Sequence, residues 1–197
     1  MSLLKDRFQW QEVWSRFRSG DQDAFSEIYQ KFIDALFAYG CKMTRDRELV
    51  KDCIQELFFR IWKNEIDLAQ ISYLKSYLII GLRRQILNML ELKFYHVDKI
   101  KLEDHFLIEF SAEDYFIQNQ FEDDQRNSVI QALNKLSIKQ REAIYLRYFE
   151  ELEYAEIAEV MNINLQSAKN NVQRGLGSLR ELLAIFLFSV FLEKTIC

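Results

Sequence analysis

Between Tyr154 and Arg180 the chain carries two short helical patterns, and the second of them displays cations and amides. Apolar residues in this second pattern recur at helical spacing, which predicts an inward face made of Leu165, Ala168, Val172 and Leu176. The side chains left outside are Gln166, Ser167, Lys169, Asn170, Gln173 and Arg174. Amide side chains suit adenine, and cations suit guanine or the phosphate backbone. The second helix is therefore a candidate reader of DNA.

A tight turn separates the two patterns. Asn tolerates left-handed backbone angles, so Asn162 can end the first helix, and Asn164 can cap the second. We therefore predict a helix-turn-helix whose second helix lies in a DNA major groove. A short polar αα-hairpin that never touches DNA is the alternative. The stretch from Leu165 to Arg180 favours DNA, because it holds three cations and no carboxylate.

Composition and charge predict how the chain is organised. The 197 residues include no proline and five glycines, and long runs of helix formers indicate an all-α protein. Residues 96–125 hold nine carboxylates and two lysines, whereas the blocks on either side are nearly neutral. We expect two small helical domains, 1–95 and 126–197, joined by an acidic linker, 96–125, with the helix-turn-helix in the second domain.

Two helices of the first domain carry candidate binding residues. Asp21 and Asp46 are well placed to cap helices, and the helix after Asp46 should expose Asp52, Gln55, Glu56 and Phe59. An aromatic ring beside carboxylates is typical of a docking surface, although such charges can merely solvate a helix. A further helix, from residue 73 to about 93, presents Lys75, Arg83, Arg84 and Asn88. Its Tyr73 and Tyr77 could stack on unpaired bases, or pack in the core.

Other function classes find no support in the sequence. Cys41, Cys53 and Cys197 form no ligand pair, so we expect neither a disulfide nor a metal site, and no motif predicts an enzyme or a cofactor. His96 and His105 lie in the acidic stretch and are expected to be solvated. The N-terminus does not resemble a signal peptide, which predicts a cytoplasmic protein. Residues 182–192 are apolar except for Ser189 but too few to span a membrane, so a continued helix is expected there.

Two motifs together resemble the extracytoplasmic-function (ECF) sigma factors of the sigma-70 family. The sequence DCIQELFFRIWK at 52–63 is similar to the family's hallmark helix. The segments QRE at 140–142, LRYF at 146–149 and EIA at 156–158 look like its C-terminal DNA-binding region. The chain departs from the family where Arg84 stands in place of a common Asn and Asn162 in place of a frequent Gly. It also lacks the usual basic run after residue 90.

The resemblance implies a function and a set of partners. Asp52, Gln55, Glu56 and Phe59 would dock on core RNA polymerase. Residues Lys75, Arg83, Arg84 and Asn88 would hold the melted promoter −10 element, and the outer face of the last helix would read the −35 element. An anti-sigma factor, which could be membrane-bound, is a further expected partner, whereas no small-molecule substrate is. The alternatives are a conventional helix-turn-helix regulator with an N-terminal interaction domain, and a protein-interaction module that works through the acidic stretch.

Overall fold

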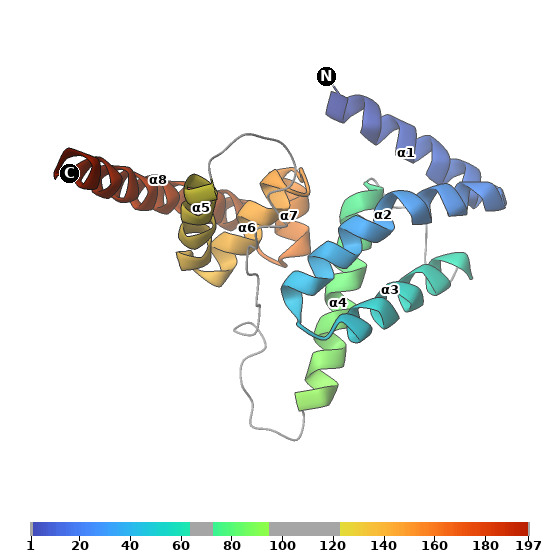
Figure 1. The fold of residues 1–197 in the computed structure, drawn as a ribbon. Coiled ribbons are helices and arrows are strands. Elements are labelled where there is room, and N and C mark those ends of the chain that lie inside the picture. The colour runs from blue at the N-terminus through green and yellow to red at the C-terminus, as the bar shows by residue number, and fades with distance from the viewer. Residues whose placement is uncertain (1, 64–72, 95–122, 197) are drawn as a thin grey trace. The chain divides into compact units, whose positions relative to one another are not determined.

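The computed structural model describes residues 2–63, 73–94 and 123–196, and these residues form helices and short connections (Figure 1). Side chains are described for 10–63, 73–92 and 127–182. The chain divides into two compact units, Met1–Phe106 and Leu107–Cys197, and the division falls within the stretch predicted as the acidic linker. Most of that stretch, including His96 and His105, lies outside the described residues. In the described part of the chain no residue is in a β-strand, so the predicted all-α fold is confirmed.

Four helices build the first unit. They are α1 (Ser2–Arg18), α2 (Gln22–Met43), α3 (Arg47–Trp62) and α4 (Leu74–Phe94). The two predicted caps are confirmed: the carboxylate of Asp21 accepts from two backbone N–H groups of α2, and that of Asp46 accepts from the Leu49 N–H at 3.0 Å. Such caps satisfy donors that have no partner within the helix, and so fix where each helix begins.

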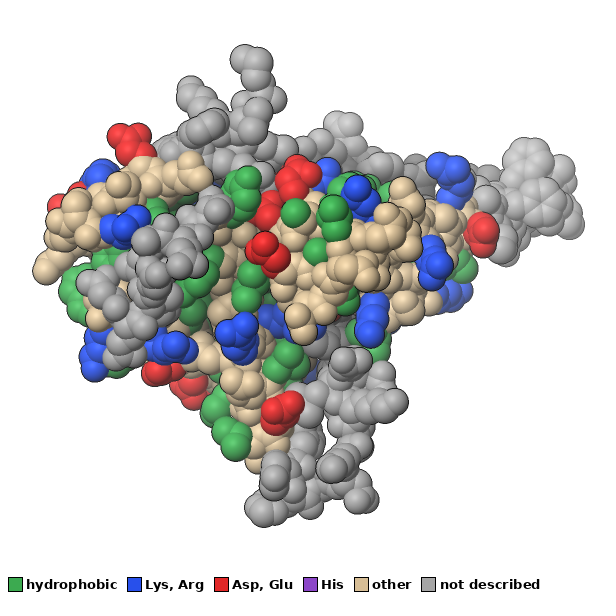
Figure 2. Space-filling view, turned by 180° about the vertical axis from the view of Figure 1, so that it is seen from behind, with side chains coloured by type: hydrophobic (Ala, Val, Ile, Leu, Met, Phe, Trp, Pro, Cys, Tyr) green, Lys and Arg blue, Asp and Glu red, His purple; other side chains and the backbone are tan. Residues whose placement is uncertain are grey.

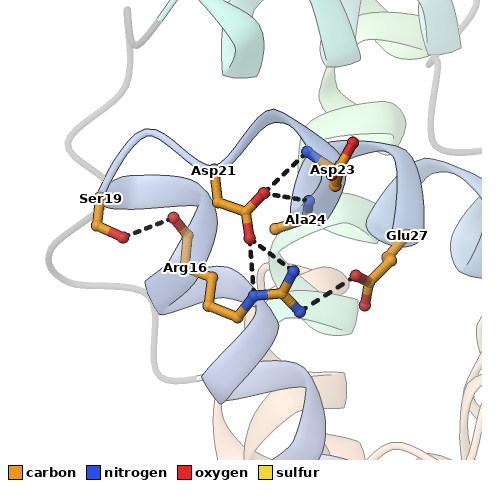
Figure 3. A network of polar contacts seen from close by, with 6 residues as sticks. All are labelled: Arg16, Ser19, Asp21, Asp23, Ala24 and Glu27. Atoms are coloured by element: carbon orange, nitrogen blue, oxygen red, sulfur yellow. Dashed lines mark hydrogen bonds and ion pairs between the residues drawn. The ribbon is translucent and has the colours of Figure 1, made fainter.

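Polar contacts tie α1 to α2 at the turn between them (Figure 3). The Arg16 guanidinium donates to the Asp21 carboxylate at 2.8 Å and to Glu27 Oε1 at 3.1 Å. Asp21 therefore both caps α2 and pairs with α1. The hydrogen bond and charge of Arg16 hold the pKa of the Asp21 carboxyl below its ordinary value. Gly20 takes φ +100° in this turn, a left-handed conformation that glycine adopts without strain.

Aromatic and aliphatic packing joins α1, α2 and α3. Phe25 of α2 contacts Phe17 of α1 and both Phe58 and Trp62 of α3, with ring centroids 4.9–6.0 Å apart. Where α2, α3 and α4 meet, a Cβ on Gly40 would lie 2.5 Å from Val50 Cγ1. The helices are therefore packed closely enough that glycine is needed at this crossing.

The second unit contains four described helices, which are α5 (Asp123–Lys135), α6 (Ile138–Tyr148), α7 (Tyr154–Val160) and α8 (Leu165–Ile196). Ser137 and Gln140 form a capping box at the start of α6. Helices α5, α6 and α7 all pack on α8, so α8 is the central element of this unit. It runs on to Ile196, which confirms the continued helix expected for the apolar end, although the side chains beyond 182 are not described.

Candidate nucleic-acid interface

The turn between α7 and α8 has the predicted backbone. Asn162 adopts φ +52°, in the left-handed region, and so ends α7. The Asn164 side chain accepts a hydrogen bond from the Ser167 N–H at 2.7 Å, which caps α8. Ile157, Ala158 and Met161 are buried beneath the turn. These contacts fix the angle at which α8 leaves α7, and they give the pair the form of a helix-turn-helix.

Arg147 fixes the loop that leads into this pair, a role that the sequence analysis missed. Its guanidinium donates to the Leu152 carbonyl oxygen at 2.8 Å, pairs with Glu153 Oε2 at 3.1 Å, and lies 4.9 Å from the centre of the Tyr154 ring. Glu151, within the same loop, takes φ +57°. One partner is a backbone carbonyl and the loop conformation is irregular, so residue spacing carries no signal for these contacts.

The outer face of α8 gathers the six predicted −35 residues on the side away from the core. Gln166, Gln173 and Arg174 are exposed, and Ser167, Lys169 and Asn170 are half-buried. Gln166 donates to the Asn170 side-chain oxygen at 2.9 Å, so two amides are already oriented with respect to each other. On the side of the molecule shown in Figure 2, Lys and Arg lie among acidic, hydrophobic and uncharged side chains. Amides and cations on the outer face of a helix can contact base edges and phosphates.

Two residues of the predicted inward face of α8 are in fact exposed. Ala168 and Val172 are fully buried, but Leu165 is 46% exposed and Leu176 is 40% exposed. Gly175 takes the inward position instead, and a Cβ there would lie 2.7 Å from Ile144 Cδ1 of α6. The prediction was wrong because it ranked residues by hydrophobicity, whereas close approach of α6 requires the smallest side chain at this position.

On α3, the predicted docking residues form one exposed row. Asp52, Gln55, Glu56 and Phe59 are all exposed, and their spacing of i, i+3, i+4 and i+7 places them on one helix face. Phe59 is 51% exposed, and the Lys63 ammonium lies 4.3 Å from the centre of its ring. A half-exposed aromatic ring can bury apolar area against a partner, and the two carboxylates beside it can pair with the partner's cations.

The four predicted −10 residues of α4 do not share one face. Arg84 and Asn88 are exposed one turn apart, and the same side of α4 carries Tyr73 and Tyr77. Lys75 leaves the helix on a different side, because two residues turn an α-helix by about 200°. Arg83 lies next to Arg84 around the helix and, like Lys75, is half-buried. The structure thus brings together two of the four residues and two tyrosines.

Tyr77 lies in a mixed apolar and cationic environment. Burial raises the pKa of its phenol, and the charges of Arg60 and Arg84 act in the opposite direction. Arg60 is an exposed residue of α3 that the sequence analysis did not select. Tyr73 is 45% exposed, so it is not a core residue, whereas Tyr77 is half-buried.

Cys41 and Cys53 are free thiols. Cys53 is buried and Cys41 half-buried, and burial raises the pKa of the Cys41 thiol. In the described ranges, no three His, Cys, Asp or Glu side chains are grouped as a metal site would require. No helix that the structure describes has both the length and the apolar character needed to cross a bilayer.

Known proteins match most of the chain. Residues 126–179, which include α6, α7 and the first turns of α8, match the family described as sigma-70, region 4. The ECF RNA polymerase sigma factor SigK of Mycobacterium tuberculosis (strain H37Rv) is 26% identical over 181 residues, covering 86% of this chain and 91% of the relative. The chain is an ECF sigma factor of the sigma-70 family. SigK of Mycobacterium ulcerans (strain Agy99) is 25% identical over 175 residues, covering 83% and 88% of the two chains.

Solved structures share the fold of this sigma factor. The sigma factor RpoE of Bartonella quintana, solved in complex with the anti-sigma factor NepR, is 21% identical with a TM-score of 0.55, over 82% of this chain and 97% of that one. CnrH, solved in complex with the cytosolic domain of CnrY, is 18% identical with a TM-score of 0.54, over 91% and 97%. As a sigma factor, the protein is a promoter-specificity subunit of RNA polymerase, and sigma factors are initiation factors rather than enzymes.

Proposed function

We propose that this sigma factor reads the −35 element with the outer face of α8. The observation that carries the proposal is that six polar side chains lie opposite a buried strip of Ala168, Val172 and Gly175. Gln166 and Lys169, in the first turns, are positioned to meet base edges in the major groove. Arg174, further along the helix, would contact phosphate. Ser167, Asn170 and Gln173 would complete the polar surface between them.

The exposed side of α4 is proposed as the surface for the melted −10 element. Arg84 can contact phosphate, Asn88 can pair with an unstacked base, and Tyr73 offers a ring on which a base can stack. Arg83 would reach the strand only from the flank of this surface, whereas Lys75 lies on another side of α4. Arg84 replaces the Asn common in the family, so we expect the −10 preference of this protein to differ from that of its relatives.

Docking on core RNA polymerase is assigned to the row formed by Asp52, Gln55, Glu56 and Phe59 on α3. The two DNA surfaces would act on one tether, residues 96–125, so each can bind weakly by itself and still contribute to tight promoter binding. We place the protein in the cytoplasm with the polymerase, and we assign it no catalytic step. An anti-sigma factor is the proposed inhibitor, in keeping with the complexes solved for RpoE and CnrH.

Transcription from defined components tests this function. Core RNA polymerase with the full-length protein should produce promoter-specific transcripts that the core alone does not make. A conventional regulator cannot replace a sigma subunit, and an interaction module would show no salt-dependent DNA affinity. Failure to initiate with saturating protein, on promoters found by transcript mapping after forced expression, would contradict the proposal.

The docking assignment has its own test. The double variant Asp52→Ala/Glu56→Ala should lose affinity for core polymerase by about tenfold or more, because two charge-assisted contacts are removed. Glu12→Ala/Asp34→Ala is the matched control, since it removes two exposed carboxylates from α1 and α2 of the same unit. Equal polymerase affinity in the two double variants would exclude the α3 row as the docking surface.

A further inference from the structure

Helices α3 and α4 approach each other closely where Gly81 meets Leu57. A Cβ on Gly81 would lie 2.7 Å from Leu57 Cδ1, so there is no room for a side chain at this crossing. Arg60 lies one turn beyond Leu57 on α3, and Tyr77 and Arg84 lie about one turn to either side of Gly81 on α4. Arg60 and Arg84 are exposed beside this crossing and Tyr77 is half-buried there. The charge of each arginine acts on the Tyr77 phenol.

Three other cations of the protein pair with carboxylates. Arg16 pairs with Asp21 and Glu27, Arg147 pairs with Glu153, and Lys51 pairs with Glu48. Among the described residues, neither Arg60 nor Arg84 forms an ion pair with a carboxylate, although Glu56 precedes Arg60 by one helical turn. Two like charges at one crossing repel each other, and an anion bound between them would relieve that repulsion.

We propose that Arg60 of α3 completes a phosphate-binding site with Tyr77 and Arg84 of α4, and that its ligand is one phosphate of the single-stranded −10 element. Guanidinium groups match the geometry of phosphate oxygens, and a tyrosine hydroxyl can donate to the same group. Asn88 and Tyr73 lie on the same side of α4, so the bases next to this phosphate would contact them. The inference rests on the proposed role of α4, and it extends the DNA surface onto the helix whose other side docks on polymerase.

The test uses holoenzyme assembled from core polymerase and the full chain, with two DNA probes. One probe is a forked promoter fragment with a single-stranded −10 element, and the other is a duplex that carries only the −35 element. The variant Arg60→Gln keeps most of the aliphatic stem of the side chain. It should lower the affinity of the holoenzyme for the forked probe about tenfold. The slope of log affinity against log salt should fall by about 0.7, as expected for one phosphate on a single strand. Duplex binding and affinity for core polymerase should not change.

Neutral methylphosphonate linkages identify the phosphate. Replacing one phosphate at a time should reveal a single position at which Arg60→Gln and Arg84→Ala no longer weaken binding, because their shared partner has gone. On the unmodified probe, Tyr77→Phe should lose less affinity than either arginine variant. Its effect should disappear when that same phosphate is replaced. Arg18→Ala, which removes an exposed arginine from α1 of the same unit, is the control and should leave the forked probe unaffected.

The outcomes separate this inference from the proposed function. If Arg84→Ala weakens the forked probe and Arg60→Gln does not, the site on α3 is refuted while the role of α4 stands. If neither variant has an effect, the proposed −10 surface fails as well. If Arg60→Gln instead lowers affinity for core polymerase, Arg60 belongs to the docking surface and the phosphate site is overturned.

Discussion

A methyl group added at Gly175 and one added at Gly177 should change stability differently, although both positions lie on α8. Nothing lies within 4 Å of a Cβ at Gly177, so Gly177→Ala gains helix propensity and should stabilise the second unit by about 1 kcal/mol. At Gly175 the added Cβ would lie 2.7 Å from Ile144 Cδ1 and 3.3 Å from its Cγ1. Overpacking of this kind costs about 1–3 kcal/mol. Both variants gain the same propensity, so Gly175→Ala should be about 1–3 kcal/mol less stable than Gly177→Ala.

The tryptophans allow the two units to be followed separately in the full chain. All three, Trp10, Trp14 and Trp62, belong to the first unit, so their fluorescence reports on it during urea unfolding. Far-ultraviolet circular dichroism reports on the helices of both units. The unfolding of the second unit is visible by circular dichroism but not by fluorescence, and we expect its midpoint to differ between the two variants. The fluorescence transition, which reports on the first unit, should be the same in both. Equal stabilisation by both substitutions would show that Ile144 moves aside without cost and that the approach of α6 to α8 does not require glycine.

Three further predictions concern promoter reading, the α6–α7 loop and acid stability. Arg174→Ala should weaken binding to all promoters about equally, whereas Lys169→Ala should change the preferred −35 sequence, as measured by selection from a randomised duplex pool. Glu151→Gly should raise the free energy of unfolding by up to about 1 kcal/mol, since φ +57° is strained for glutamate; Glu151→Ala keeps the Cβ and should give no such gain in a urea titration. The pKa of Asp21 is lowered in the folded state, mainly by its hydrogen bond from Arg16, so its contribution to stability is present at neutral pH and is lost as pH falls below about 3.8. Asp21→Asn keeps a good cap but should remove this part of the acid dependence of tryptophan-monitored melting, and an unchanged pH profile would contradict the assignment.

Local side-chain contacts to the backbone were the part of the fold that the sequence predicted best. Asp21, Asp46 and Asn164 cap their helices, and Asn162 takes the left-handed conformation expected of it. Each of these depends on a residue and its next two or three neighbours, so the physics is contained in the local sequence. The helical periodicity likewise predicted the exposed row on α3, because that helix buries one side only.

Features that depend on a neighbouring helix could not be predicted in this way. The inward position of Gly175 depends on the approach of α6, and a residue without a side chain gives no hydrophobic signal. The half-burial of Lys75 and Arg83, beside an exposed Arg84, depends on how α2 and α3 cover α4. Arg60 was missed for the same reason, since its relation to Tyr77 exists only once α3 and α4 have packed.

Helix α8 joins the turns that carry the proposed −35 surface to the apolar end of the chain without a break. Its 32 residues correspond to a rod about 48 Å long, and bending a continuous helix is far harder than turning a loop. The orientation of the last turns is therefore coupled to that of the first turns. A molecule bound to the last turns would restrict the orientation of the turns that carry Gln166 and Lys169 without touching them.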